Sequence, residues 1–352
     1  MPNWNTSMQQ TFEYYTVDPS TWGDVKQLTC VKRCTIDWDL ETDTLGSATI
    51  DLDEQIKETY IRIYLITIQN GVKEKFPLGT FLVQSLPISF DGMKETISAD
   101  AYTPLIELNE KYPDIGYFLE ENENIMYWSY MLTKANLRAP VVKPSSTKKL
   151  NDDLVAETNE TWLSYIRTLM SNAEYSYSLD EMGRVLFSPI QKIEALQPVW
   201  TFNDDNSSIL YPDIDMDRDL YGIPNVIEVI ASNGSEVFHI TVENNNIDSP
   251  TSIPNRGRRI VHRETDPKIT GYLTEDRVKE YAQIMLKELS SMEHTLTFTH
   301  GYCPVHVGDC IRLNYEKFNL HNVKAKIISQ SIKCEPGCPV TSKAVFTTKL
   351  WR

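Results

Sequence analysis

The residues in this sequence that could do chemistry are its cysteines, its histidines and one short run of aspartates. The six cysteines are Cys30, Cys34, Cys303, Cys310, Cys334 and Cys338. Cys334 and Cys338 are separated by three residues, which is within the spacing of zinc ligands. Cys303 and Cys310 could complete a four-thiolate site only if their strands converge. The tight paired turns of common zinc sites are missing, so we interpret all six cysteines as reduced structural thiols.

The aspartates alternate with other residues between positions 213 and 219, at Asp213, Asp215, Asp217 and Asp219. A calcium-binding EF-hand loop also places oxygens at alternate positions. However, Arg218 stands where that loop needs glycine, and Pro224 stands where it needs glutamate. On a β-strand the four carboxylates would share one face. We therefore predict an acidic row that faces solvent or an interface, rather than a calcium site.

The histidines and the remaining motifs give no catalytic constellation. His294, His300 and His306 are evenly spaced, but Gly301 and Pro304 should break the strand that would align them. The sequence has no HExxH pair, GxSxG elbow, Walker A loop or GxGxxG turn. With 49 acidic residues, accidental carboxylate pairs are certain, and they indicate no glycosidase by themselves. We predict no catalytic, cofactor-binding or metal-binding residues and no enzymatic activity.

Composition indicates a folded chain with room for two or three domains in 352 residues. No apolar run approaches the roughly 18 residues that a membrane helix needs, so we predict no membrane insertion. The N-terminus has no basic segment followed by an apolar core, so we expect no secretory signal and no disulfide framework. The net charge of −15 should repel nucleic-acid phosphates. It is consistent with solubility alone, or with a channel wall past which DNA slides without sticking.

The elements that must position these side chains begin with a series of β-strands, which the sequence predicts in the first 110 residues. The stretch from Tyr60 to Ile68 is rich in Ile and Tyr and is the strongest strand candidate. Asn70-Gly71 favours a type I′ hairpin turn after it, with a return strand over 76–82. Asp91-Gly92 indicates a second hairpin. Alternation predicts further strands over 35–40 and 48–52.

The pattern changes to mixed helix and hairpin between about Pro104 and Gln197. Three helices are expected, over 105–108, 125–132 and 162–170. A hairpin is expected to follow, from residues 175–179 and 184–187. The segment 244–270 is polar and contains three prolines, so we interpret it as a long connection.

The C-terminal part predicts one helix followed by short strands. Residues at helical spacing between Thr274 and Ser291 form one apolar face: Val278, Tyr281, Ala282, Met285, Leu286 and Leu289. Thr274 is a suitable N-cap. Strands are expected over 294–299, 310–313, 323–332 and 340–350, with a turn at 304–309. A helix that packs on a small antiparallel barrel would bury such a face.

The order of these elements resembles the baseplate-hub proteins of phage tails, relatives of contractile-tail hubs and of type VI secretion spike proteins. The stretch 278–315 resembles the start of the family's second tube-type barrel, where Pro304 and Gly308-Asp309 fit its turn. Residues 76–83 resemble a strand of its first barrel. Residues 99–105 and 221–229 resemble the segments that leave that barrel and return to it.

The resemblance implies a mainly β fold with two tube-like antiparallel β-barrels and an α+β insert made of helices and a hairpin. We expect the first barrel in 1–110, completed by 200–245. The insert is then 111–199. The second barrel is 246–352, with the helix 274–291 supporting it.

The resemblance also implies a structural role in the virion tail. The expected assembly is a homotrimer whose six barrels form a ring. That ring joins the hexameric tail tube, or a distal tail protein, to the spike or fibre, and so adapts one symmetry to another. The tape-measure protein and then DNA would pass through its channel without specific binding. Such a subunit is assembled in the host cytoplasm.

Two other functions stay open at this point. A tail-associated cell-wall hydrolase would usually append a catalytic module after the barrels, whereas this sequence stops at Arg352 just past the last expected strand. A receptor- or glycan-binding tail module would cluster its aromatic side chains in one exposed cleft.

Overall fold

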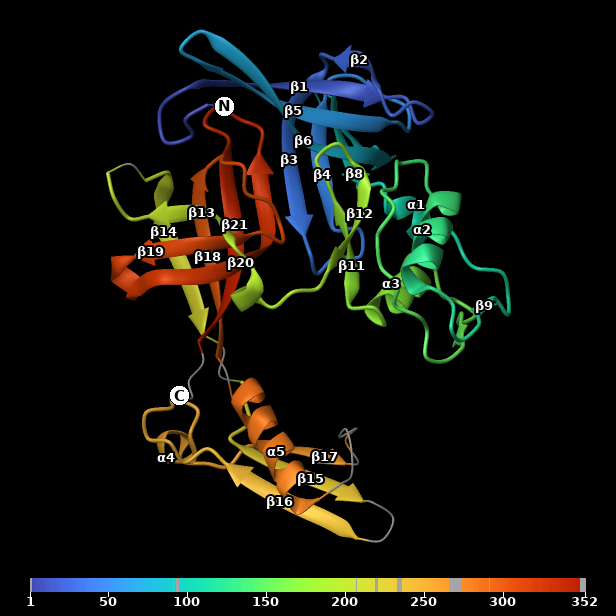
Figure 1. The fold of residues 1–352 in the computed structure, drawn as a ribbon. Coiled ribbons are helices and arrows are strands. Elements are labelled where there is room, and N and C mark those ends of the chain that lie inside the picture. Colours follow the sequence, from blue (N-terminus) through green and yellow to red (C-terminus); the bar gives the residue numbers. More distant parts are fainter. Residues whose placement is uncertain are drawn as a thin grey trace. The chain divides into compact units, whose positions relative to one another are not determined.

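The computed structural model describes residues 2–90, 92, 95–206, 208–218, 221–232, 236–265, 267, 274–290 and 292–348 (Figure 1). The chain forms two units, the first from Met1–Ile214 and Phe298–Ala344, the second from Asp215–Thr297 and Val345–Arg352. Most of the described elements are strands, and most strand pairs are antiparallel, so the predicted mainly β class is confirmed. In the described part of the chain, no helix is long and apolar enough to cross a membrane.

The N-terminal strands build the first part of the large sheet. Their bounds are β1 Gln9–Val17, β2 Asp24–Leu28, β3 Val31–Asp39, β4 Gly46–Leu52, β5 Tyr60–Gln69, β6 Val72–Ser85, β7 Ile88–Phe90 and β8 Glu95–Tyr102. Their order is β3-β4-β8-β6-β5-β1-β2, and β7 pairs with β8. Asn70 and Gly71 have φ values of 52° and 79°, so the predicted type I′ turn between β5 and β6 is confirmed. The second predicted hairpin is β7–β8, although Asp91 lies outside the described residues.

Six further strands continue the same sheet. They are β13 Pro198–Asn203, β14 Leu210–Arg218, β18 Met292–Gly301, β19 Cys310–Tyr315, β20 Leu320–Lys333 and β21 Pro339–Thr348. The C-terminal strands were predicted close to these bounds. Strand β20 pairs with β21 and β19, and its last residues also pair with β3. Because β20 pairs with strands of both groups, these two groups form one 14-stranded sheet.

Residues 200–245 do not complete the first group of strands, and this part of the prediction was wrong. Strand β13 pairs in parallel with β19, and β14 pairs with β18, so both join the C-terminal strands. The following strands, β15 Val226–Ser232 and β16 Val237–Glu243, lie in a separate sheet. Alternation of side chains identifies a strand but not its partner, which is why the sequence misassigned this segment.

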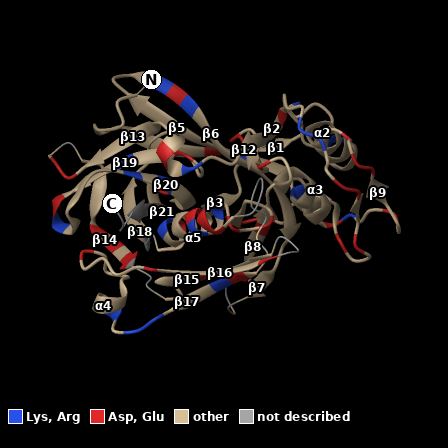
Figure 2. Ribbon diagram, turned by 60° about the horizontal axis from the view of Figure 1, so that its bottom comes forward, with Lys and Arg blue, Asp and Glu red and all other residues tan. Residues whose placement is uncertain are grey.

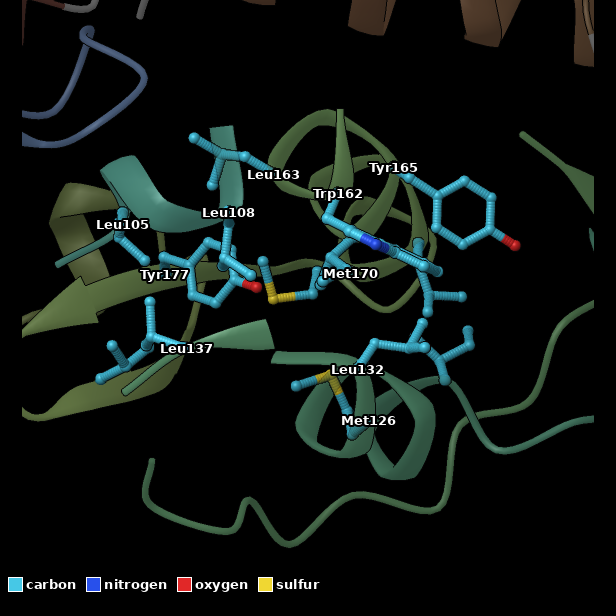
Figure 3. Close-up of a cluster of buried hydrophobic side chains, with 14 of the residues drawn as sticks. Leu105, Leu108, Met126, Leu132, Leu137, Trp162, Leu163, Tyr165, Met170 and Tyr177 are labelled. Atoms are coloured by element: carbon cyan, nitrogen blue, oxygen red, sulfur yellow. The ribbon is translucent and has the colours of Figure 1, made fainter. Parts of the chain in front are cut away.

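The segment between β8 and β13 carries its own hydrophobic core (Figure 3). Its elements are α1 Ile106–Asn109, β9 Phe118–Leu119, α2 Ile125–Asn136, β10 Leu154–Val155, α3 Trp162–Ser171, β11 Tyr175–Leu179, β12 Val185–Pro189 and the 3₁₀ turn η1 Ile193–Ala195. Asn124 and Thr161 cap α2 and α3, each accepting a hydrogen bond from a backbone amide in the first turn. Met126, Trp162 and Met170 are among the side chains that fill this core. The three predicted helices and the hairpin are confirmed.

The second unit is a three-stranded sheet covered by one helix. Strand β15 lies between β16 and β17 Val261–Thr265, and α5 Glu275–Leu289 packs on β15 and β16. Val278, Ala282 and Leu286 of α5 are buried among strand residues such as Ile227. Figure 1 shows α5 lying along these strands.

Three expectations about this region need correction. The helix 274–291 was expected to support a second barrel in 246–352, but its apolar face packs on β15 and β16, which precede that range. Leu289 was expected to be buried but is 39% exposed, and Met285 is only partly buried. The segment 244–270 is also more than a connection, since it contains α4 Ile253–Arg256 and β17, which pairs in parallel with β15. Thr274 is the N-cap of α5, as predicted.

Candidate functional site

The tip of the β11–β12 hairpin is held against the N-terminal strands by one buried arginine. The side chain of Arg62 on β5 is 1% exposed and pairs with Asp24 at 2.8 Å. It also donates to the Thr80 hydroxyl at 2.9 Å and to the Met182 carbonyl at 3.1 Å. The indole of Trp22 donates to the same carbonyl at 2.7 Å. The hydrogen bonds of one cation thereby join β5, β6, the start of β2 and the hairpin tip.

Gly183 lets the hairpin tip approach this closely. Its φ is +76°, a left-handed conformation that side chains disfavour. A Cβ placed there would lie 2.7 Å from the Cβ of Thr80. Both the backbone conformation and the space therefore require glycine at this position.

The same hairpin tip is joined to the turn before β19 by a histidine. His306 Nε2 lies 2.8 Å from a carboxylate oxygen of Glu181, and its Nδ1 lies 3.6 Å from Asp309. Burial lowers the pKa of His306, but the hydrogen bonds to Asp309 and Glu181 outweigh it and raise the pKa to about 9. Burial raises the pKa of Glu181, but the hydrogen bond and the charge of His306, together with smaller contributions from the backbone and Arg184, outweigh it and leave that pKa below its ordinary value. At neutral pH this is an ion pair between the hairpin tip and the β19 turn.

A second buried ionic cluster fixes the start of the α+β segment. Glu107 of α1 accepts a hydrogen bond from the hydroxyl of Tyr60 on β5. Arg138, just after α2, donates to the same carboxylate from Nε at 2.5 Å and from its backbone amide at 3.0 Å. Sequence reasoning missed both clusters, although an arginine inside the apolar run of β5 was a visible signal.

The cavity and the groove near the hairpin tip do not form a ligand-binding site. A cavity of about 60 Å³ is lined mostly by apolar side chains, among them Trp38, Leu78 and Tyr302. A more open groove of about 670 Å³ shares Glu181 and His306 with it. The cavity has room for water rather than for a sugar ring. Glu181, which lines both hollows, and Asp309, which lines the groove, are paired with His306, an arrangement that holds segments together.

The acidic row lies on an open edge of the large sheet. Strands β14 and β2 stand at the two ends of the strand order among the described residues. Asp213, Asp215 and Asp217 are exposed along β14, whereas Ile214 and Met216 are half-buried, so the predicted alternation is confirmed. Figure 2 shows acidic residues in red along β14. Asp219 lies outside the described residues.

The three evenly spaced histidines lie in different surroundings. His294 stacks on Phe346, with ring centroids 4.8 Å apart. His300 is fully buried and lies 2.8 Å from the hydroxyl of Ser342, and burial lowers its pKa to about 4. His306 belongs to the hairpin-tip contact described above.

All six cysteines are free thiols. Cys303 lies 3.9 Å from a ring nitrogen of His300, and Cys310 donates to the carbonyl of Ile311. Cys334 instead lies beside Cys34. In the described part of the chain, no group of three or more His, Cys, Asp or Glu side chains is arranged to hold a metal ion.

The whole fold is shared with known structures, although the sequence is not. No protein-family model matches the chain, and no curated protein matches it in sequence. The structure of a tail protein from Neisseria meningitidis MC58 aligns with this chain over 96% of each of the two chains, at 10% sequence identity and a TM-score of 0.65. The 43 kDa tail protein of prophage MuSo2 from Shewanella oneidensis aligns with 95% of this chain over 97% of its own length, at 12% sequence identity and a TM-score of 0.64. The chain has the fold of phage tail proteins.

Two further structures extend this likeness. Prophage tail protein gp18 from Listeria monocytogenes EGD-e matches 94% of each chain at 13% identity and a TM-score of 0.52. The structure of a Francisella PdpA–VgrG complex covers 98% of this chain with 53% of its own, at 9% identity and a TM-score of 0.57. The predicted resemblance to tail and hub proteins is thereby confirmed at the level of the fold.

Proposed function

We propose that this protein is a structural subunit of a viral tail baseplate hub. The observation that carries the proposal is the likeness to tail proteins, which extends over nearly the whole chain. The described contacts agree with a structural role, because the best-built polar clusters join segments of the chain rather than surround a pocket. Arg62 and Glu107 are both buried in such clusters.

The proposed assembly is a homotrimeric ring. Among the described strands, β2 and β14 end the strand order with open edges, and open edges are suited to pairing with another chain. A ring of three copies would join a hexameric tail tube, or a distal tail protein, to a spike or fibre. The tape-measure protein and DNA would pass through its centre. The net charge of −15 favours passage of DNA without binding.

Native mass spectrometry of the purified protein and cryo-EM of assembled tails test this proposal. We expect a trimer, and density for this chain at the end of the tail tube. A stable monomer or a dimer within the particle would refute it. Zymography on peptidoglycan tests the non-enzymatic part of the proposal, and a cleared zone that depends on this chain would favour a tail-associated hydrolase.

A further inference from the structure

Two cysteines far apart in the sequence lie opposite each other where β3 meets the end of β20. The register of these strands pairs Thr35 with Lys333 and Ile36 with Ile332. One step further, the backbone amide of Cys334 donates to the carbonyl of Cys34 at 2.9 Å. Cys34 and Cys334 are therefore directly opposed residues of an antiparallel pair, and their side chains project from the same face.

This geometry is compatible with a disulfide. Hydrogen-bonded partners in an antiparallel pair have Cα atoms about 5.5 Å apart. A disulfide spans Cα separations of roughly 4.4–6.8 Å. The strand register and the backbone hydrogen bond between Cys34 and Cys334 therefore hold the two side chains beside each other on neighbouring strands.

The surroundings determine which thiol reacts first. Cys34 is buried, and burial raises its pKa well above the ordinary value, so it is a poor first nucleophile. Cys334 is half-exposed and accessible to a small oxidant. Tyr14 on β1 and Cys338 lie near this pair. Cys338 is fully buried.

We propose that Cys34 and Cys334 are a redox-active pair that forms a cross-strand disulfide when the protein meets a small-molecule disulfide such as oxidised glutathione. The Cys334 thiolate attacks one sulfur of glutathione disulfide, forming a mixed disulfide and releasing one glutathione thiolate. Cys34 then loses its proton and attacks the Cys334 sulfur, releasing the second glutathione. Two protein thiols are oxidised, and one glutathione disulfide is reduced to two thiols.

The bond would tie β3 covalently to the end of β20, and therefore join the N-terminal and C-terminal strand groups where β20 links them. It would close a loop that contains most of the chain, which restricts the unfolded state. The oxidised protein should therefore unfold at a higher temperature, by roughly 2–4 °C.

Peptide mapping in glutathione redox buffers tests the proposal on the full chain. After free thiols are blocked with N-ethylmaleimide, we expect a linked Cys34–Cys334 peptide in oxidising buffer and its loss after reduction. Free Cys34 and Cys334 under oxidising conditions would overturn the proposal, as would a Cys334–Cys338 link. This measurement needs no variant, so it does not depend on the folding of a mutant.

Three variants then test the order of the steps. C34S should stop at the mixed disulfide, with one glutathione on Cys334, and should lose the gain in unfolding temperature. C334S should leave Cys34 unmodified, because the buried thiol has no accessible partner. C30S is the matched control, and it should still form the bond. Glutathione on Cys34 in C334S, or no bond in C30S, would contradict the proposed order.

Discussion

The guanidinium of Arg62 is almost completely buried, and its hydrogen bonds reach segments far apart in the sequence. Replacing Arg62 with Met would leave Asp24 without its cation and the Met182 carbonyl without one of its donors. We expect a loss of about 3 kcal/mol in the free energy of unfolding, since removing one partner of a buried pair leaves the other uncompensated. Urea unfolding measures this loss.

A matched control lies on the neighbouring strand. Lys73 on β6 pairs with Glu13, but its side chain is 60% exposed. Lys73→Ala should cost less than about 1 kcal/mol, because exposed ion pairs contribute little. Equal losses for the two variants would show that the Arg62 cluster does not hold the hairpin tip.

The contact between His306 and Glu181 should make stability depend on pH. The pKa of His306 is raised to about 9 from an ordinary value of 6.5. Its contribution to the free energy of unfolding is therefore complete below pH 6.5 and is lost as the pH rises through 9. The pKa of Glu181 is lowered from 4.5, so its contribution is lost as the pH falls through that lowered value. The side chain of His306 is 47% exposed, so solvent screening should limit its effect to about 1 kcal/mol.

Thermal unfolding between pH 6 and 10 tests this dependence. The protein should lose stability across the upper half of that range, and His306→Gln should flatten this part of the profile. His321 hydrogen-bonds to Asn319 rather than to a carboxylate, so His321→Gln should leave the profile unchanged. A His306→Gln profile that still falls as the native one does would rule out this contact as the cause.

At the scale of the elements, local signals in the sequence predicted well where helices and strands occur. The β5–β6 hairpin follows from Asn70-Gly71, and the α3 helix follows from an apolar stripe over 162–170. The partner of α5 was not predictable in the same way. Its stripe fits any apolar sheet, and it packs on Ile227 and Val229, about 50 residues earlier in the chain. Helical periodicity determines which face is buried but not which sheet covers it.

Two leucines on α5 test the corrected assignment with the same substitution. Leu286 is 1% exposed and packs among the β15 residues, whereas Leu289 is 39% exposed. Leu286→Asp should cost about 3 kcal/mol or more, because it buries an unpaired carboxylate. Leu289→Asp and Lys287→Ala should be nearly neutral. Circular dichroism during urea unfolding measures the free energy of unfolding of all three variants. A large loss for Leu289→Asp would mean that Leu289 belongs to the buried face of α5.

At the scale of the whole molecule, long-range strand pairing was the part that the sequence did not reveal. The sheet is continuous because β20 is long enough to pair with β19 and then with β3. Nothing in the alternation of residues 320–333 distinguishes those two partners. The buried Arg62 cluster depends on equally distant contacts, since Met182 lies 120 residues away along the chain.

The acidic row of β14 is our candidate for a segment that faces the channel of the proposed ring. Asp213, Asp215 and Asp217 are exposed on a strand with an open edge. Reversing them together to lysine should slow DNA ejection, because a basic stripe would attract phosphates that the native row repels. The effect should weaken as salt rises, since the Debye length falls to about 3 Å at 1 M.

The control for this prediction reverses acids elsewhere on the chain while changing net charge equally. Glu120, Glu121 and Asp153 are exposed in the α+β segment around β9 and β10. Their replacement by lysine should leave ejection unchanged, because these side chains are not expected to line the channel. Ejection kinetics from assembled tails, measured at two salt concentrations, distinguish the two variants. Equal slowing by both would mean that net charge, rather than the β14 row, controls passage, and the acidic surplus would then be explained by solubility.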